Sequence, residues 1–300
     1  MKKVKIITDS CSDLSGELLE KYGIDYARMN TIYQGKEKVA SLTWEEYSPK
    51  ELYDIMRGGE RITTTQVPVQ EFMRIFRKYL DEGFDIIYIG CSSKQSGSVN
   101  TGTVAAKDLL GEYPDSRITC IDALNACIGE GMLAVFAAEL AMSGKSYDEI
   151  VDAVMSARNR VNQYVTVHSL DALKRAGRVK ASSAFFGNLM GVKPILISDA
   201  NGEQTPIKKV RGRAKSLEEI VSLLAESIEN PEEQIIYIAH ADCDEKELDT
   251  LRNLIAQKIK SRDICTVYIG PIIGASIGPD AIGVWAFGKE VTYRVEEAKQ

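Results

Sequence analysis

Short apolar runs alternate with longer amphipathic stretches along this chain. Five runs rich in β-branched residues predict strands, at residues 4–8, 86–90, 118–122, 235–240 and 264–269. Five stretches with apolar residues three and four positions apart predict helices, at residues 70–79, 103–110, 133–142, 217–228 and 245–259. A further helix is expected at 14–22, and the polar residues before it, including Ser12 and Asp13, either cap this helix or belong to a ligand site at the carboxyl end of the first strand. The alternation predicts α/β layers in which helices cover both faces of a sheet.

The pattern changes near residue 160. Residues 147–163 are expected to form a long connecting helix, and the segment that follows is richer in Gly and Pro. We expect an N-terminal α/β domain with a Rossmann-like parallel sheet at residues 1–160. A C-terminal α/β domain with a mixed sheet is expected at 161–300. Residues 194–210 predict a hairpin around Asn201-Gly202, since this pair tolerates positive φ angles.

Composition narrows the class of protein. Of the 300 residues, 44% are hydrophobic and 27% are charged, which is typical of a soluble globular protein. The 43 acidic residues exceed the 37 basic ones, and a net charge of -6 argues against a nucleic-acid partner. The six cysteines never form a CxxC pattern and are expected to be free thiols, mostly buried. Because neither a signal peptide nor a run of membrane-spanning length is evident, a cytoplasmic location is expected.

Two clusters of hydroxyl residues stand where helices are expected to begin. The first, Thr63 to Thr65, precedes a helix expected near residue 69, and the second lies between Cys91 and Ser98, directly after a strand. Exposed N–H groups at a helix entrance bind anions without any Lys or Arg, so both clusters are candidate sites for a carboxylate or phosphate. Neither matches the phosphate loop GxxxxGK[ST] or the nucleophile elbow GxSxG.

Other chemistry is weakly indicated. With only two histidines, His168 and His240, the sequence shows no metal-ligand pattern, so neither a metal nor a cofactor is expected. His240 ends an apolar strand, where a structural hydrogen bond is the simpler interpretation. Four apolar residues, Phe185, Phe186, Leu189 and Met190, could form a lipid-binding wall, but on spacing alone ordinary core is the better interpretation. The glycines between 270 and 283 are expected to mark either tight bends in an apolar strand or places where another part of the chain approaches the backbone closely.

The order of several motifs resembles that of the DegV family. They are TDSCSDL, TTTQVP, SSKQSGS, LDALKRAGRV with GVKPIL, KVRGRAK and IGPIIGASIGP, and they span nearly the whole chain. The resemblance implies two α/β domains with a long-chain fatty acid, such as palmitate, bound between them. Its carboxylate would be held by hydroxyls of the N-terminal domain and its tail by an apolar pocket of the C-terminal domain.

The resemblance also assigns residues. The family's TSQ motif corresponds to Thr64-Thr65-Gln66 and its SG pair to Ser96-Gly97, so Thr64 and Ser96 are the expected carboxylate ligands, with Thr65 and Gly97 beside them. The residues implied for the tail pocket are Phe185, Phe186, Leu189 and Met190.

Some relatives present the fatty acid to a separate kinase, which implies a role in fatty-acid transport or metabolism. Three arginines lie in segments that the resemblance links to that kinase or to the phosphate it forms: Arg178, Arg211 and Arg213. This chain departs from many relatives at Ser276, where they have His, and at Asp280, where they have Gly. Binding of a fatty acid does not require the imidazole of that histidine. Its absence argues against a role in the transfer of phosphate by the partner kinase. A non-catalytic carrier is the expectation, and a stand-alone enzyme acting on a phosphorylated or acyl substrate in the same cleft is the alternative.

Overall fold

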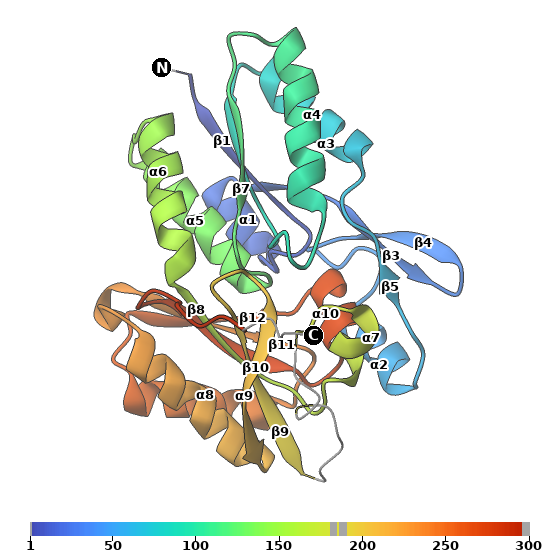
Figure 1. Ribbon diagram of the computed structural model, residues 1–300, viewed down its shortest axis with the longest axis vertical. Helices are drawn as coiled ribbons and strands as arrows, with labels where there is room; N and C mark the ends of the chain where they lie inside the picture. Colours follow the sequence, from blue (N-terminus) through green and yellow to red (C-terminus); the bar gives the residue numbers. More distant parts are fainter. Residues whose placement is uncertain (1, 181–184, 186–190, 296–300) are drawn as a thin grey trace.

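Two β-sheets follow one another along the long axis of the molecule (Figure 1). The computed structural model describes residues 2–180, 185 and 191–295. The first half of the chain forms the upper sheet in Figure 1 and the second half forms the lower one. This arrangement confirms the expected α/β fold class with one parallel and one mixed sheet.

The upper sheet is entirely parallel. Its strands, in spatial order, are β2 (Asp25–Ala27), β1 (Val4–Asp9), β6 (Asp85–Gly90) and β7 (Ile118–Asp122). Helices α3 (Val69–Asp81) and α4 (Ser98–Glu112) pack together on one face. The opposite face is covered by α5 (Ile128–Met142), against which α1 (Gly16–Tyr22) and α6 (Tyr147–Ala157) pack. All four carboxyl ends therefore meet at one edge, where open α/β sheets bind their ligands.

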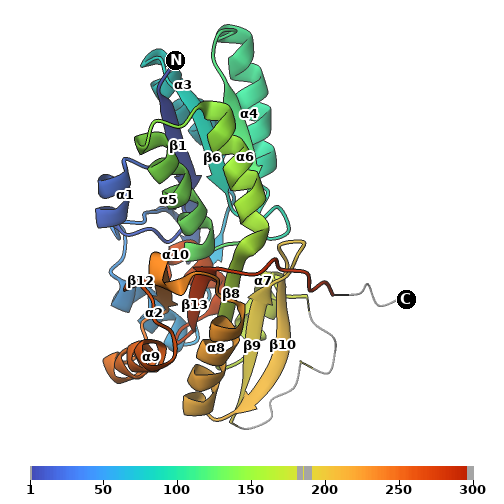
Figure 2. The ribbon, with the colours of Figure 1, turned by 90° about the vertical axis from the view of Figure 1, so that its left-hand side faces the viewer.

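The lower sheet is mixed. Its strands, in spatial order, are β10 (Gln204–Arg211), β9 (Val192–Ser198), β8 (Val161–Thr166), β13 (Ile282–Phe287), β11 (Ile235–His240) and β12 (Asp263–Tyr268). Only β11 and β12 pair in parallel, and β9 and β10 form the expected antiparallel hairpin. Helix α8 (Arg213–Ser227) packs on this sheet and α9 (Glu245–Lys258) lies beside α8 (Figure 2).

A third, smaller group of elements joins the two halves. It contains a three-stranded antiparallel sheet and three short helices: β4 (Lys36–Ala40), β3 (Met29–Tyr33), β5 (Thr63–Thr64), α2 (Pro49–Arg57), α7 (Asp171–Ala176) and α10 (Pro271–Ile277). Helix α10 comes from the second half of the chain but contacts α2, β3 and β5 of the first half. The two halves are thus packed together through this group as well as through α5.

Helix α5 explains how the two sheets share one core. It reads IGEGMLAVFAAELAM and is apolar on nearly every side, the pattern of a helix that is buried all round. It packs on β1 and β6 of the upper sheet and also on β8 and β13 of the lower sheet. Its first turn carries Glu130, whose side chain is fully buried. A carboxylate in so apolar a helix is costly unless the fold gives it a partner.

Three expectations about local structure are wrong. Helix α6 ends at Ala157, because the apolar residues after it form strand β8 from Val161 onward. Helix α1 is capped by Ser15, whose hydroxyl accepts the Leu18 N–H, and not by Ser12 or Asp13. The glycine-punctuated segment forms helix α10 instead of a bent strand. The domain boundary near residue 160 remains a prediction.

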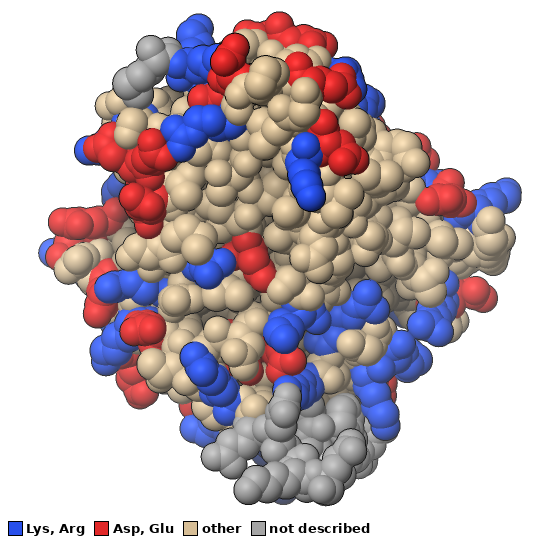
Figure 3. Space-filling view, turned by 45° about the horizontal axis from the view of Figure 1, so that its top comes forward, with Lys and Arg blue, Asp and Glu red and all other residues tan. Residues whose placement is uncertain are grey.

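Charged side chains lie mainly around the border of the face in Figure 3, and the middle of that face is largely uncharged. Within the described residues, no helix combines the length and the apolar character that a membrane crossing requires. All six cysteines are free; Cys11, Cys91 and Cys127 are buried and the other three are half-buried.

Candidate ligand-binding site

A cavity of about 840 Å³, counted with its opening, lies between the carboxyl edge of the upper sheet and the face of the lower sheet. The upper side contributes loops that follow β1, β6 and β7, and the lower side contributes side chains of β8, β10 and β13. Sequence-distant segments therefore meet around one space.

Thr64 and Thr65 reach the cavity from the three-stranded sheet. Thr64 lies in β5, opposite Thr31 of β3. Thr65 is used structurally: its N–H donates to the Asn30 carbonyl at 2.9 Å, and its hydroxyl accepts the Asn30 N–H at 3.3 Å. Neither hydroxyl caps α3, whose N-terminal residue Pro68 has no side-chain cap. Strand pairing, and not helix capping, holds these threonines at the cavity.

Ser96 is oriented by the start of α4. Its hydroxyl accepts the Ser98 N–H at 3.3 Å and lies 2.9 Å from the Ser98 hydroxyl. Ser98 Oγ in turn accepts the Val67 N–H at 3.1 Å. With the Ser98 hydroxyl as donor to Ser96, the Ser96 hydroxyl keeps its own proton for a group in the cavity. The arrangement presents a hydrogen-bond donor beside the positive end of the α4 dipole.

Gly97 packs closely against the Gln66 side chain. A Cβ atom on Gly97 would overlap the Gln66 amide oxygen. The Gln66 amide donates to the Thr101 hydroxyl at 2.8 Å, and that hydroxyl donates to the Gly97 carbonyl at 3.2 Å. Gln66 thus ties the TTTQ segment to the SG pair.

The loop that carries Ser96 is also held from the second half of the chain. Ser92 Oγ and Gln95 Nε2 both donate to the Gly202 carbonyl, at 2.8 Å and 3.0 Å, in the turn between β9 and β10. Arg178 Nε donates to the Gln95 carbonyl at 3.1 Å. The position of Ser96 therefore depends on contacts with both halves.

A second, more open cavity adjoins the first. Thr64, Arg178 and Ser276 border both cavities, and Arg61 and Arg175 line the second one. Ser276 lies in α10 and its hydroxyl donates to the Ile272 carbonyl of the same helix at 3.4 Å. Arginine side chains consequently lie next to the hydroxyl groups on the side where the two cavities meet.

The apolar wall of the main cavity was not found from the sequence. It is formed by Val165, Leu173, Ile269, Ile272, Ile273, Ile277 and Trp285. Phe185 packs against the main hydrophobic cluster, with the Lys209 ammonium 5.5 Å from its ring centroid, and is not among these lining residues. Phe186, Leu189 and Met190 lie outside the described residues. The tail pocket assigned to these four residues remains a prediction.

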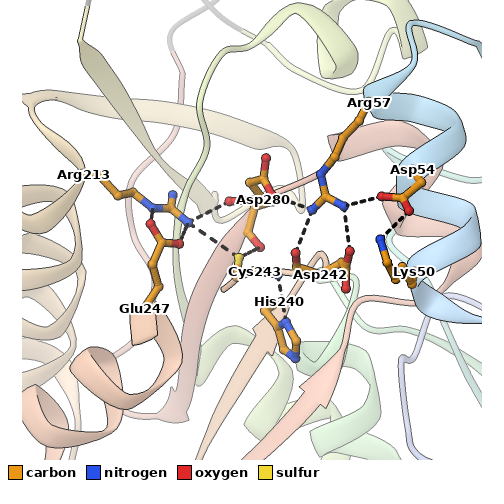
Figure 4. Close-up of polar contacts among 10 residues, drawn as sticks. Lys50, Asp54, Arg57, Arg213, His240, Asp242, Cys243, Glu247 and Asp280 are labelled. Atoms are coloured by element: carbon orange, nitrogen blue, oxygen red, sulfur yellow. Dashed lines mark hydrogen bonds and ion pairs between the residues drawn. The ribbon is translucent and has the colours of Figure 1, made fainter. Parts of the chain in front are cut away.

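Arg211 and Arg213 do not line the cavity. Arg211 is exposed at the end of β10. Arg213 forms two hydrogen bonds with the Glu247 carboxylate, at 3.0 and 2.9 Å, and a third with the Asp280 carbonyl at 2.8 Å (Figure 4). The Arg213 guanidinium is therefore part of a structural hydrogen-bond network that does not include the Thr64 and Ser96 hydroxyls.

Both histidines lie away from the lining of the main cavity. His240 Nδ1 accepts the Cys243 N–H at 3.3 Å, as expected for a structural histidine (Figure 4). Burial lowers the pKa of His240 to about 4, so it is neutral at pH 7. His168 Nδ1 lies 2.9 Å from the Lys193 ammonium.

Among the described residues, side chains that could bind a metal ion lie close together at one place. No metal-binding motif in the sequence indicates this cluster. Cys11, Cys91 and Glu130 each offer a ligand atom, and these atoms lie within 4.8 Å of one another. The two cysteines also line the main cavity.

Comparison with known proteins places this architecture in one family. Residues 3–289 match the family model described as uncharacterised protein, DegV family. A DegV domain-containing protein of Clostridium perfringens is 37% identical over 288 residues, covering 96% of this chain and 98% of the relative.

Among solved structures, the chain is similar to a DegV family protein from Thermus thermophilus that is described in connection with fatty acid binding. The TM-score is 0.86 and the identity is 27%, and the match covers 96% of this chain and 100% of that one. DegV from Bacillus subtilis, described as a fatty acid binding protein, is similar with a TM-score of 0.82 and 26% identity over 96% of this chain and 100% of that one. The family model and the relative cover nearly the whole sequence, and the chain therefore belongs to the DegV family.

Proposed function

We propose that this chain binds one long-chain fatty acid in the main cavity. The observation that carries the proposal is that one cavity combines an apolar wall with hydroxyl groups at Thr64 and Ser96. The similar structures from Thermus thermophilus and Bacillus subtilis, which are described as fatty acid binding, support the same ligand class. In this proposal the carboxylate accepts hydrogen bonds from Ser96 and Thr64, with Thr65 and Gly97 shaping the site around them.

The two parts of the cavity contribute differently to binding. Each methylene removed from water contributes about 0.8 kcal/mol, so the tail supplies most of the affinity. A hydroxyl that donates to a carboxylate contributes roughly 1.5 to 3 kcal/mol and only in one orientation of the ligand. The hydroxyls therefore determine which end of the fatty acid lies at Ser96 and Thr64.

We further propose that the chain is a carrier in fatty-acid transport or metabolism. Neither histidine lines the cavity, so no imidazole is placed to activate a lining hydroxyl or thiol. A kinase partner would reach the carboxylate through the adjoining cavity, where Arg178 and Ser276 lie between the hydroxyl groups and Arg61 and Arg175. Cationic groups at that opening suit an incoming phosphate.

The test is native mass spectrometry of the purified chain, followed by denaturing extraction and identification of the released lipid. We expect one fatty acid per chain. The variant Thr64→Val with Ser96→Ala should retain much less fatty acid after identical purification, with its circular dichroism spectrum unchanged.

A matched control is Thr250→Val with Ser222→Ala, which removes the same groups from α9 and α8, where each hydroxyl bonds only within or between those helices. Equal lipid occupancy in the two double variants would remove the head-group assignment. An empty protein that also stays empty after incubation with fatty acids would remove the proposed function.

A further inference from the structure

Two cysteines that are 80 positions apart in the sequence are held together at the edge of the upper sheet. Cys11 follows β1 and Cys91 follows β6, and these strands are parallel neighbours, so their carboxyl ends adjoin. A single carboxylate fixes both: Asp9 accepts the Cys11 N–H at 2.9 Å through Oδ1 and the Cys91 N–H at 3.2 Å through Oδ2. The Tyr88 hydroxyl donates to the same Oδ2 at 2.7 Å. The backbone of the cysteine pair is therefore positioned before any ligand binds.

Glu130 supplies a third candidate ligand from the first turn of α5. Its Oε1 accepts the Thr8 hydroxyl at 2.7 Å and the Asp9 N–H at 3.3 Å. Its Oε2 is buried and has no hydrogen-bond partner among the described residues. An unpartnered buried carboxylate oxygen is costly, and a bound cation would remove that cost.

We propose that Cys11, Cys91 and Glu130 form a site for one thiophilic d¹⁰ metal ion, such as Zn²⁺ or Cu⁺, in the wall of the cavity. Their ligand atoms lie within 4.8 Å of one another. Tetrahedral zinc with two sulfur ligands and one oxygen ligand separates its ligand atoms by roughly 3.5 to 3.8 Å, so side-chain shifts of about 1 Å complete the geometry.

The surroundings favour a soft cation. Met29 Sδ lies 3.6 Å from Cys11 Sγ, which adds a thioether next to the two thiols, and sulfur ligands select Zn²⁺ and Cu⁺ over Mg²⁺ or Ca²⁺. Within the part of the chain that the structure describes, the groups that donate to Asp9 and Glu130 are neutral: backbone N–H groups, a tyrosine and a threonine. A cation would therefore be the positive partner that these two fully buried acids otherwise lack.

Binding would release protons. The hydrogen bond with Cys91 and burial raise the pKa of Cys11, and the pKa of Cys91 is also raised, so both are thiols at pH 7. Metal binding then replaces the protons of both thiols and of the Glu130 carboxyl group, whose pKa burial also raises: M²⁺ + 2 RSH + RCOOH → [M(SR)₂(OOCR)]⁻ + 3 H⁺. Affinity should consequently fall as the pH is lowered. Because Cys11 and Cys91 line the cavity, the ion would be reached from that side and would keep one coordination position open to it.

The experiment is a titration of the full-length protein with Cd²⁺, Zn²⁺ and Cu⁺ under a phosphine reductant that keeps the thiols reduced. Cd²⁺ binding is followed by thiolate-to-metal charge-transfer absorption, Zn²⁺ and Cu⁺ by competition with chelators, and proton release by an indicator dye. We expect one ion per chain and three protons released per divalent ion, one from each thiol and one from the Glu130 carboxyl group. The variant Cys11→Ser with Cys91→Ser should lose at least about 100-fold in affinity, and Glu130→Gln should lose about 10-fold or more.

The matched control is Cys120→Ser with Cys265→Ser, which removes two half-buried thiols elsewhere and should bind the ions like the natural protein. Absence of stoichiometric binding in the natural protein, or undiminished affinity in the Cys11 and Cys91 double variant, would overturn the proposal. Should that variant not fold, X-ray absorption of the zinc-loaded natural protein decides: sulfur neighbours at about 2.3 Å support the site, and a shell of only nitrogen and oxygen overturns it. Glu130→Gln should weaken metal binding but leave fatty-acid retention unchanged. This difference separates the metal site from the proposed ligands of the fatty-acid carboxylate.

Discussion

Asp13 should make the folded protein less stable as the pH rises, and Asp13→Asn should remove that effect. The Asp13 side chain is 3% exposed and its Oδ1 accepts the Gly270 N–H at 2.9 Å, a contact between the two halves of the chain. Burial raises the pKa of Asp13 from 3.8 to about 8, although the Cys127 thiol and the Gly270 N–H act in the opposite direction. Asn keeps the acceptor for Gly270 and tolerates the φ of 50° at this position.

The magnitude follows from proton linkage. The unfolded chain loses the Asp13 proton near its ordinary pKa, whereas the folded chain keeps it until the pH approaches 8. Between about pH 5 and 7 the folded state therefore binds one more proton, and its free energy of unfolding falls by about 1.4 kcal/mol per pH unit. Over that window Asp13 removes about 3 kcal/mol, which is a large part of a typical domain stability.

Urea unfolding at several pH values between about 5 and 7, followed by circular dichroism, measures this slope. Burial also raises the pKa of Glu130 and Asp9, so the natural protein has further contributions of the same sign. These contributions are common to both proteins and cancel in the difference between the natural protein and Asp13→Asn. Asp115→Asn, which alters an exposed carboxylate, is the control for removing one negative charge.

If the stability curves of Asp13→Asn and the natural protein run parallel across this window, the carboxyl group does not hold its proton in the folded state, and the reasoning from burial is refuted. A slope difference of at least about 1 kcal/mol per pH unit supports it.

Two further changes test one contact between the two halves of the chain and one contact at the cavity. Arg57→Ala should lower the free energy of unfolding by about 2 kcal/mol, because the Arg57 guanidinium of α2 donates to two carboxylates of the second half of the chain. These are Asp242 Oδ2 at 2.6 Å and Asp280 Oδ1 at 2.7 Å (Figure 4). Urea unfolding measures the change, and Arg57→Lys is the comparison. Gly97→Ala should reduce fatty-acid retention in the extraction assay, because the alanine methyl group would displace Gln66. Adding Gln66→Ala to this variant should restore part of the lost retention. Full retention in Gly97→Ala alone would contradict the close packing.

Much of the fold could be predicted from local pattern. Strands β7 and β11 have the expected bounds, 118–122 and 235–240, because each is a short apolar run bounded by polar residues. Helix α10 was missed because its glycines suggested a bent strand. Those glycines serve tertiary contacts: a Cβ on Gly270 would lie 2.6 Å from Asp13 Oδ1, and one on Gly274 would lie 2.5 Å from the Tyr53 hydroxyl. Both partners come from the first half of the chain, so no local pattern reveals the reason.

Some residues of the candidate site could be predicted from the sequence and others could not. Thr64 and Ser96 were recognisable because hydroxyls cluster in short motifs that stand next to helices, and the structure brings both residues to one cavity. The apolar wall comes instead from single residues on β8, β13, α7 and α10, each of which follows an ordinary core pattern. The grouping of Cys11, Cys91 and Glu130 depends on strand order, which their sequence spacing does not encode.

The proposed carboxylate site has to overcome the same desolvation that raises the pKa of Asp13. A fatty-acid carboxylate bound as proposed would have buried acids behind the cavity wall, where Asp13 contacts the lining residue Cys127, and Arg178 is the one Lys, Arg or His among the described lining residues. Its charge is tolerated only if donors replace the lost water, and the start of α4 offers the Ser96 hydroxyl together with the dipole of a 15-residue helix. The neighbouring acids make this easier when they are neutral, because a protonated carboxyl group does not repel the ligand. In the proposed complex, burial that raises the pKa of Asp13 and hydroxyls that donate to the ligand would therefore act in the same direction, because both favour a negative charge on the fatty acid over one on the protein.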